Sequence, residues 1–192
     1  PNTVIMAPSN ERECQLMLNT GFRLNGPSIV RYPRGNGTGE ALPAIDETIE
    51  IGKGVIIISS KEAASKAKDT LNTATKGIAI LSFGSMLAEA KIAALALNAT
   101  LVDMRFVKPL DQTLIDDLNR QHDYLVTVED NAIAGGAGSG VNEYLLAQGK
   151  PVCILNIGVM DEFVKHGTQE EVHQELGLDS QGIINKIIHF IS

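Results

Sequence analysis

Two arginines, Arg31 and Arg34, lie close together at the start of a glycine-rich stretch, residues 35–39. They bracket the expected carboxyl end of a short strand at residues 28–32, and ligands in open parallel sheets bind outside the carboxyl ends of strands. A guanidinium next to free backbone N–H groups suits the bidentate binding of a phosphate. In a chain with a net charge of −7, an anionic substrate would need such a local positive site. A plainer alternative is that one arginine is a surface charge and the other forms a salt bridge with a neighbouring helix.

A second glycine-rich run, residues 135–140, lies between an expected strand and an expected helix, so a phosphate cradle has to be considered. The run lacks the GxGxxG spacing and the GK[ST] ending of nucleotide-binding loops. Close packing of the helix on the sheet is the preferred interpretation. Glu129 and Asp130, just before the run, could bind a cation or cap the turn that follows. Because one acidic pair without further ligands is a weak metal signal, we predict no metal site.

The histidines and cysteines form no recognisable catalytic set. His166 falls in an expected loop between a strand and a helix, where functional residues gather, and is a candidate for contact with a ligand or a domain interface. Cys14 and Cys153 are far apart in the sequence, which argues against a zinc site and fits a reducing cytoplasm. The other histidines are expected in helices or at helix ends and are interpreted as solvated: His122, His173 and His189.

The composition is that of a soluble globular protein, with 44% hydrophobic and 20% charged residues. The acidic balance and the 4% aromatic content argue against a nucleic-acid partner. No apolar run approaches the roughly 20 residues that a membrane span requires. A lysine-rich stretch at residues 61–76 is interrupted by Glu62 and Asp69, so it is interpreted as a surface helix and not as a membrane patch. We therefore expect a cytoplasmic protein that binds neither nucleic acid nor membrane.

The elements that must position the two arginines form a short strand–helix–strand unit. A strand is expected at residues 4–8, a helix at residues 11–20 capped by Ser9 or Asn10, and a second strand at residues 28–32. This order implies a parallel pair of strands in a larger sheet. Because about 40 residues cannot cover both faces of such a sheet, we expect its remaining strands to come from sequence ahead of this chain.

A regular alternation of strands and helices sets in at residue 77. It predicts a three-layer αβα fold with a mostly parallel sheet, large enough to fold alone. Thr168 and Glu171 form a capping box at the start of one helix. Between the two units, a short strand or hairpin is expected at residues 48–59 and a helix at residues 61–71. The expected strands are residues 78–83, 100–104, 124–128 and 152–157, and the expected helices are residues 86–97, 111–120, 139–148, 168 onward and 183–191.

Several sequence segments resemble one enzyme superfamily. The run VDMRFVKPLD, residues 102–111, resembles the strand-to-helix signature in the C-terminal domain of the transketolase superfamily. RYPRG, residues 31–35, looks like the end of that superfamily's pyrimidine-binding domain. The finer resemblance is to the 1-deoxy-D-xylulose-5-phosphate synthase family, and it is carried by residues 5–9, 126–131, 135–142, 155–158 and 167–171.

The resemblance implies that the chain is the C-terminal portion of such an enzyme. Residues 1–42 would be the tail of the pyrimidine-binding domain, residues 43–75 a linker with a helical insertion, and residues 76–192 the transketolase-type C-terminal domain. In that family thiamine diphosphate adds to pyruvate, CO2 leaves, and the resulting enamine attacks glyceraldehyde 3-phosphate. The product feeds isoprenoid, thiamine and pyridoxal precursors. Enzymes of this kind form homodimers, and the C-terminal domain contributes to the dimer interface.

The same resemblance assigns few functional residues to this chain. Thiamine diphosphate and Mg²⁺ are held by segments of the family that have no counterpart here, so we expect no catalytic, cofactor-binding or metal-binding residue and no activity of the chain alone. Arg34, the second arginine of RYPRG, matches the residue that contacts the phosphate of glyceraldehyde 3-phosphate. Arg31 is a weaker candidate with a mainly structural role, and Arg105 inherits no catalytic role.

Two departures from the family pattern and two other functions stay open. Residues 59–76 look longer than the family's usual connection, and Asp130 stands where the family often has glutamate. The first alternative function is that of another superfamily member, such as the β subunit of a 2-oxoacid dehydrogenase. The second is a stand-alone assembly or interaction module.

Overall fold

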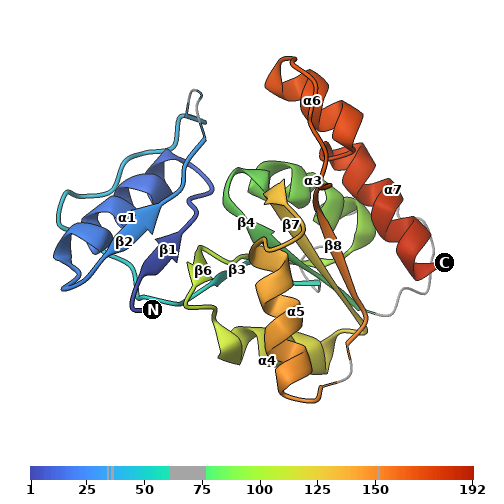
Figure 1. Cartoon of the computed structure of the whole chain (residues 1–192), viewed down its shortest axis with the longest axis horizontal. Helices are drawn as coiled ribbons and strands as arrows, with labels where there is room; N and C mark the ends of the chain where they lie inside the picture. Colours follow the sequence, from blue (N-terminus) through green and yellow to red (C-terminus); the bar gives the residue numbers. More distant parts are fainter. Residues whose placement is uncertain (34, 36, 61–76, 151) are drawn as a thin grey trace.

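The computed structural model describes residues 1–192 except 34, 36, 61–76 and 151. The described residues form two sheets, and Figure 1 shows a small N-terminal unit, in blue, beside a larger main domain. The α/β class and the mostly parallel main sheet that the sequence predicts are confirmed. None of the described helices combines the length and the hydrophobicity that a transmembrane span needs.

The main sheet has the strand order β3-β5-β4-β7-β8. The strands β4 (Ile78–Phe83), β5 (Thr100–Asp103), β7 (Tyr124–Ala132) and β8 (Ile154–Val159) run parallel to one another. At one edge, β3 (Val55–Ile58) pairs antiparallel with β5. Because β3 lies within the expected linker, the main sheet takes an edge strand from ahead of the predicted domain boundary.

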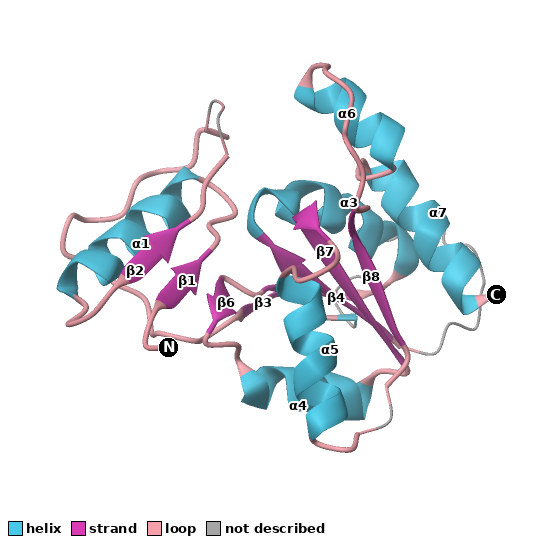
Figure 2. Cartoon of the chain, viewed as in Figure 1, coloured by secondary structure: helices cyan, strands magenta, loops and turns pink. Residues whose placement is uncertain are grey.

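Helices cover both faces of the main sheet, as Figure 2 shows. One face carries α3 (Leu87–Leu97), which follows a short 3-10 turn, and α7 (Ser180–Ile191). The other face carries α4 (Gln112–Gln121) and α5 (Ala137–Ala147). The eight-residue helix α6 (Gln169–Leu176) precedes α7.

The alternation of side chains along each strand supplies both faces of the sheet with apolar groups. In the central strand β4, Ile80 packs in the same cluster as Ala93 of α3 and Ile187 of α7. Its neighbour Leu81 points the other way and packs in the same cluster as Ile115 of α4. All of these side chains are fully buried, so the main domain has a continuous core on each side of the sheet.

The predicted helix caps are present. Asp111 accepts a hydrogen bond from the backbone N–H of Leu114 at the start of α4. Thr168 and Glu171 form the predicted capping box of α6. These local signals depend only on neighbouring residues, which explains why a single sequence predicts them well.

The N-terminal unit contains the expected parallel pair and one strand that was not expected. β1 (Val4–Met6) pairs in parallel with β2 (Ser28–Val30). β6 (Phe106–Lys108), which belongs to the signature run of the main domain, pairs antiparallel with the other edge of β1. The helix α1 (Glu11–Arg23) joins β1 to β2. One sheet thus combines strands that are about a hundred residues apart in the chain.

The predicted end of α1 at about residue 20 is wrong, because the helix continues through Gly21 to Arg23. A Cβ at Gly21 would lie 2.6 Å from Oγ of Ser28. The glycine therefore serves a close approach of α1 to β2, and it does not end the helix.

The core of the N-terminal unit is small. It consists of Met6 of β1, Met17 of α1 and Phe106 of β6, each fully buried. Two large apolar side chains of the unit are exposed: Ile29 of β2 is 51% exposed and Phe22 of α1 is 93% exposed. Within the described residues, the outer edge of β2 has no strand partner, and whether further strands join it stays a prediction. The largest side chain of its core, Phe106, comes from the main domain.

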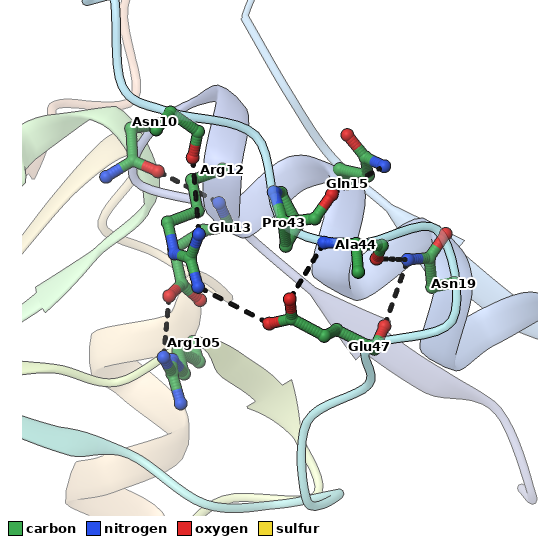
Figure 3. Close-up of polar contacts among 10 residues, drawn as sticks. Asn10, Arg12, Glu13, Gln15, Asn19, Pro43, Ala44, Glu47 and Arg105 are labelled. Atoms are coloured by element: carbon green, nitrogen blue, oxygen red, sulfur yellow. Dashed lines mark hydrogen bonds and ion pairs between the residues drawn. The ribbon is translucent and has the colours of Figure 1, made fainter.

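A turn at Arg105 joins the two units. Its backbone lies in the left-handed region, with φ of 57°, which costs a residue other than glycine about 1–2 kcal/mol. Its carbonyl oxygen accepts a hydrogen bond of 2.8 Å from the backbone N–H of Ala7. Its guanidinium forms a 2.6 Å ion pair with Glu13 of α1, and both side chains are largely buried (Figure 3). Beside this pair, Asp103 accepts hydrogen bonds from the Ser9 hydroxyl at 2.6 Å and from the Arg105 backbone N–H at 3.1 Å.

The buried Asp103 at the interface between the units should make the stability of the folded chain depend on pH. Burial, with a smaller contribution from the nearby Glu13 carboxylate, raises the pKa of Asp103 from 3.8 to about 6. The folded chain therefore binds this proton more tightly than the unfolded chain. The resulting stability is fully present below about pH 4 and is lost as the pH rises through 6.

We predict that Asp103→Asn removes this loss, because an amide fills the same space without a charge. Its carbonyl oxygen can accept from the Arg105 backbone N–H, and its NH2 group can donate to the Ser9 hydroxyl. The free energy of unfolding of both proteins should be measured in urea from pH 4 to pH 7.5. With rising pH it should fall in the unaltered chain by up to about 3 kcal/mol more than in the variant. Parallel pH profiles for the two proteins would contradict this assignment.

Candidate functional site

A cavity of about 330 Å³ lies between the N-terminal unit and the main domain. Pro33 and Gly35 are part of its wall, and they flank Arg34, the predicted phosphate ligand, which lies outside the described residues. The cavity is lined from both units, among others by Glu11, Tyr32, Thr38, Ser85 and Gln169. Tyr32, Pro33 and Gly35 of the RYPRG motif therefore line a space that a small ligand fits. The role of Arg34 stays a prediction.

Arg31 forms a link between the two units. Its backbone N–H donates to the carbonyl oxygen of Met6 at 2.8 Å, next to the parallel pairing of β1 and β2. Its guanidinium donates to the backbone carbonyl oxygen of Asp130, which lies within strand β7 of the main domain, at 2.6 Å. This contact supports the mainly structural role expected for Arg31, because the side chain is used in fixing the N-terminal unit on the main domain.

Glu11, at the start of α1, holds the loop that follows RYPRG. Its carboxylate accepts hydrogen bonds from the Thr38 backbone N–H at 2.8 Å, the Thr38 hydroxyl at 3.0 Å and the Glu40 backbone N–H at 2.7 Å, and it also accepts one from the Gly39 backbone N–H. Hydrogen bonding from its own backbone and from Thr38 lowers the pKa of Glu11 to about 2. The carboxylate is therefore ionised at every pH near neutrality.

The segment after this loop runs along α1 (Figure 3). Arg12 donates to the carbonyl oxygen of Ala41 at 3.2 Å, and its guanidinium lies 3.4 Å from the Glu47 carboxylate. Asn19 donates to the backbone carbonyl oxygen of Glu47 at 2.9 Å. Further along α1, the Thr20 hydroxyl accepts from the backbone N–H of Ile49 at 3.0 Å. Exposed contacts of this kind are weak singly, but their series fixes the path of the segment.

The glycine-rich turn at residues 135–140 packs α5 closely on the sheet, as preferred from the sequence. The buried Glu129 carboxylate accepts hydrogen bonds of 2.8 Å from the backbone N–H groups of Ala137 and Gly138. A Cβ at Gly138 would lie 2.3 Å from Oγ1 of Thr127. Because a protein carboxylate already occupies the N-terminus of α5, the alternative of a phosphate cradle is wrong. Of the two roles considered for Glu129, capping is the one observed.

The expected start of α5 at residue 139 is corrected by the same contact. The helix begins at Ala137, because Glu129 satisfies the N–H groups of its first turn.

In the part of the chain that the structure describes, no three His, Cys, Asp or Glu side chains gather where they could hold a metal ion.

The histidines differ from one another in their surroundings. His166 is exposed in the loop between β8 and α6, so its contact with a ligand or a domain interface stays a prediction. The interpretation of His122 as solvated is wrong. Its ring is half-buried, and its nitrogens lie 2.9 Å from the Thr100 hydroxyl and 3.0 Å from the Leu118 carbonyl oxygen. His122 thus ties the end of α4 to β5.

Sequence reasoning missed the roles of Glu11, Glu13 and Ser9. The sequence marks both glutamates as favourable charges in the first turn of a helix, which they are. It gives no sign of their partners, because Thr38 and Arg105 are 27 and 92 positions away. The usable signal was a pair of acidic residues just after the carboxyl end of an expected strand, where ligands of parallel sheets bind.

Comparisons with known proteins agree with the fold. Residues 67–183 match a family described as "Transketolase, C-terminal domain". Over all 192 residues the chain is 75% identical to the 1-deoxy-D-xylulose-5-phosphate synthase of Colwellia psychrerythraea and covers 30% of that protein. It is 51% identical over the same length to the enzyme of that name from Pseudoalteromonas translucida, of which it covers 28%. The chain therefore spans less than a third of the length of these relatives.

Two solved structures share the fold. The protein described as "Split gene transketolase, inactive beta4 tetramer" is similar over the whole chain with a TM-score of 0.78 at 23% identity, and 58% of it is covered. A transketolase from Leishmania mexicana is similar with a TM-score of 0.61 at 14% identity, and 25% of it is covered. The family match extends over more than half of the chain and contains the four parallel strands of the main sheet. The chain therefore belongs to the transketolase family and carries its C-terminal domain.

Proposed function

We propose that this chain works as the C-terminal part of a 1-deoxy-D-xylulose-5-phosphate synthase. The parent enzyme would condense pyruvate with glyceraldehyde 3-phosphate, with loss of CO2, and so supply isoprenoid, thiamine and pyridoxal precursors. The observation that carries the proposal is the 75% identity to an enzyme of that name over every residue of the chain. Such a level of identity spans both units and the connection between them.

The two units would have different tasks in the parent enzyme. Residues 1–42 would complete the pyrimidine-binding domain and bring Arg34 to the phosphate of glyceraldehyde 3-phosphate. Residues 43–75 would connect the domains, and residues 76–192 would complete the fold and contribute to a homodimer interface. The parent enzyme would work in the cytoplasm. The cavity beside Pro33 and Gly35 supports a substrate-binding role for the first unit.

The parent enzyme would use thiamine diphosphate, which supplies the electron sink for the loss of CO2, and Mg²⁺, which would bind its diphosphate. The described residues of this chain do not fit these groups. Among them, the glycine-rich start of α5 is occupied by the Glu129 carboxylate, and no cluster of acidic side chains suited to Mg²⁺ is present. We propose that the rest of the parent enzyme holds both, and that this chain contributes substrate binding and structure.

We predict that the chain alone forms no product from pyruvate and glyceraldehyde 3-phosphate, because it does not supply the coenzyme site. Titration calorimetry with thiamine diphosphate and Mg²⁺ should show no binding in the micromolar range. Micromolar binding by the chain would contradict this division of tasks.

The positive test is a chimera in which this chain replaces the matching segment of the Colwellia psychrerythraea enzyme. We expect the chimera to form 1-deoxy-D-xylulose 5-phosphate at a rate near that of the unaltered enzyme. A chimera that melts cooperatively but makes no product would overturn the proposal, as would transfer to a lipoyl acceptor, which is the activity of a 2-oxoacid dehydrogenase. A stand-alone assembly module would give a folded but inactive chimera.

We predict that Arg34→Ala in the chimera raises KM for glyceraldehyde 3-phosphate far more than KM for pyruvate. The loss of one charge-assisted contact should cost roughly 1.5–3 kcal/mol, which corresponds to roughly a tenfold to hundredfold rise. The matched control is Arg23→Ala, which removes an exposed arginine at the end of α1. Equal effects on the two substrates would count against a phosphate contact.

A further inference from the structure

A second cavity, of about 340 Å³, borders the last strand of the main sheet. Four consecutive residues of β8, residues 155–158, line it. Because successive side chains of a strand point to opposite faces of the sheet, a space bordered by all four lies along the side of the strand. Figure 2 shows β8 as the outer strand of this sheet, next to α5 and α7. The cavity therefore follows the free edge of β8.

The hydrogen bonds between β7 and β8 determine which backbone groups face this edge. The N–H of Leu125 in β7 donates to the carbonyl oxygen of Cys153 at 2.9 Å. In a parallel pair the bonds to the neighbouring strand come from every second residue, so the odd-numbered residues of β8 face β7. The N–H and C=O groups of Ile154, Asn156 and Gly158 point away from the sheet. Among the residues that the structure describes, no strand pairs with this edge.

Such an edge is suited to an extended backbone. A row of unpaired N–H and C=O groups is a template on which another strand can form hydrogen bonds. Proteins usually protect their sheet edges with charged side chains or proline, and the sequence of β8, ILNIGV, contains neither. Gly158 is buried, and Ile154 and Asn156 are half-buried, so water reaches these backbone groups only in part. Another strand would satisfy them more fully.

The alternation along β8 allows it to pair with a second copy of itself. A two-fold axis at Asn156 pairs this residue with the same residue of the other copy, and it pairs Ile154 with Gly158 of the other copy. Each of these pairs joins residues whose backbone groups point outward, so every outward group gains a partner. Met160, which lines the cavity and is 62% exposed, would be covered in the process.

The charges at the two ends of β8 favour the same antiparallel arrangement. Lys150 precedes the strand and Glu162 follows it, so the register centred on Asn156 brings Lys150 of one copy near Glu162 of the other. The Lys150 ammonium already donates to Asp116 at 2.5 Å, and it has two further N–H groups for a second carboxylate. A parallel arrangement would bring like charges together, and it would not close into a symmetric dimer.

We infer that two copies of this chain associate through β8, whose free edges pair antiparallel about Asn156 and join the two main sheets into one. This surface goes beyond the function proposed above, because the pairing involves the chain alone and does not depend on the reaction of the parent enzyme. Activity of the chimera and association of the chain are separate observations, so either can fail without the other.

The test is the oligomeric state of the chain, measured by sedimentation velocity from about 1 to 200 μM, where we expect a dimer with a dissociation constant of roughly 10 μM. Hydrogen exchange followed by NMR should show that the amides of Ile154, Asn156 and Gly158 gain protection as the concentration rises. The amides of Leu155 and Ile157, which face β7, should change little. A chain that stays monomeric at about 200 μM would overturn the inference and leave the edge to a strand of another protein or of the parent enzyme. A dimer without this alternation in protection would overturn it as well.

Two variants test the pairing and the charges separately. Ile154→Pro removes an outward N–H, which an edge strand tolerates, and it should weaken the dimer at least about tenfold. Glu162→Lys, in an exposed loop, places like charges together near Lys150 and should weaken the dimer about fivefold at low salt and less at high salt. The matched control is Glu50→Lys, which makes the same change of charge at an exposed position of the connecting segment and should have no effect.

Melting curves establish that each variant is folded. If Ile154→Pro does not fold, Glu162→Lys decides on its own, because its side chain is exposed. A dimer of unchanged strength in the folded variants would overturn the inference, as would equal effects of Glu162→Lys and Glu50→Lys.

Discussion

The arrangement of the two units depends on the turn at Arg105. The residue is held in a left-handed conformation, and it gives its carbonyl oxygen and its guanidinium to the N-terminal unit. Glu13, its partner, is only 9% exposed. Removing one member of a buried ion pair leaves the other charge without compensation, at a cost of about 3–5 kcal/mol. The fully buried cluster of the N-terminal unit is small (Met6, Met17 and Phe106), so polar contacts between the units, including those of Ser9 and Arg31, add to what the turn at Arg105 contributes.

The helix α1 connects the turn at Arg105 to the cavity. One turn of α1 places Glu13 against the main domain and Glu11 against residues 38–40. Polar side chains further along it hold the connecting segment, up to Ile49 on Thr20. Contacts of α1 therefore connect the loop that follows RYPRG to the main domain.

The sequence predicted what local patterns determine, and it failed where distant residues meet. Strand β4, the capping box of Thr168 and the α/β class follow from periodicity and neighbouring residues. Strand β6 was missed because its three residues are too few for a period and its partner β1 is a hundred positions away. The contacts of Glu11 with Thr38 and of His122 with Thr100 were missed because their partners are 27 and 22 positions away. Even the glycine at position 21 was misinterpreted, since only the packed structure shows that Ser28 lies beside it.

The central claim is that Arg105 holds the N-terminal unit on the main domain, and hydrogen exchange of the backbone amides tests it most directly. Exchange of the chain should be compared with that of Arg105→Ala and of Arg120→Ala, which removes an exposed arginine from its pair with Asp117. We predict that Arg105→Ala abolishes protection in residues 4–23 and leaves that of β4 and β7 intact, while Arg120→Ala changes neither. Full protection of residues 4–23 without the Arg105 side chain would contradict the account.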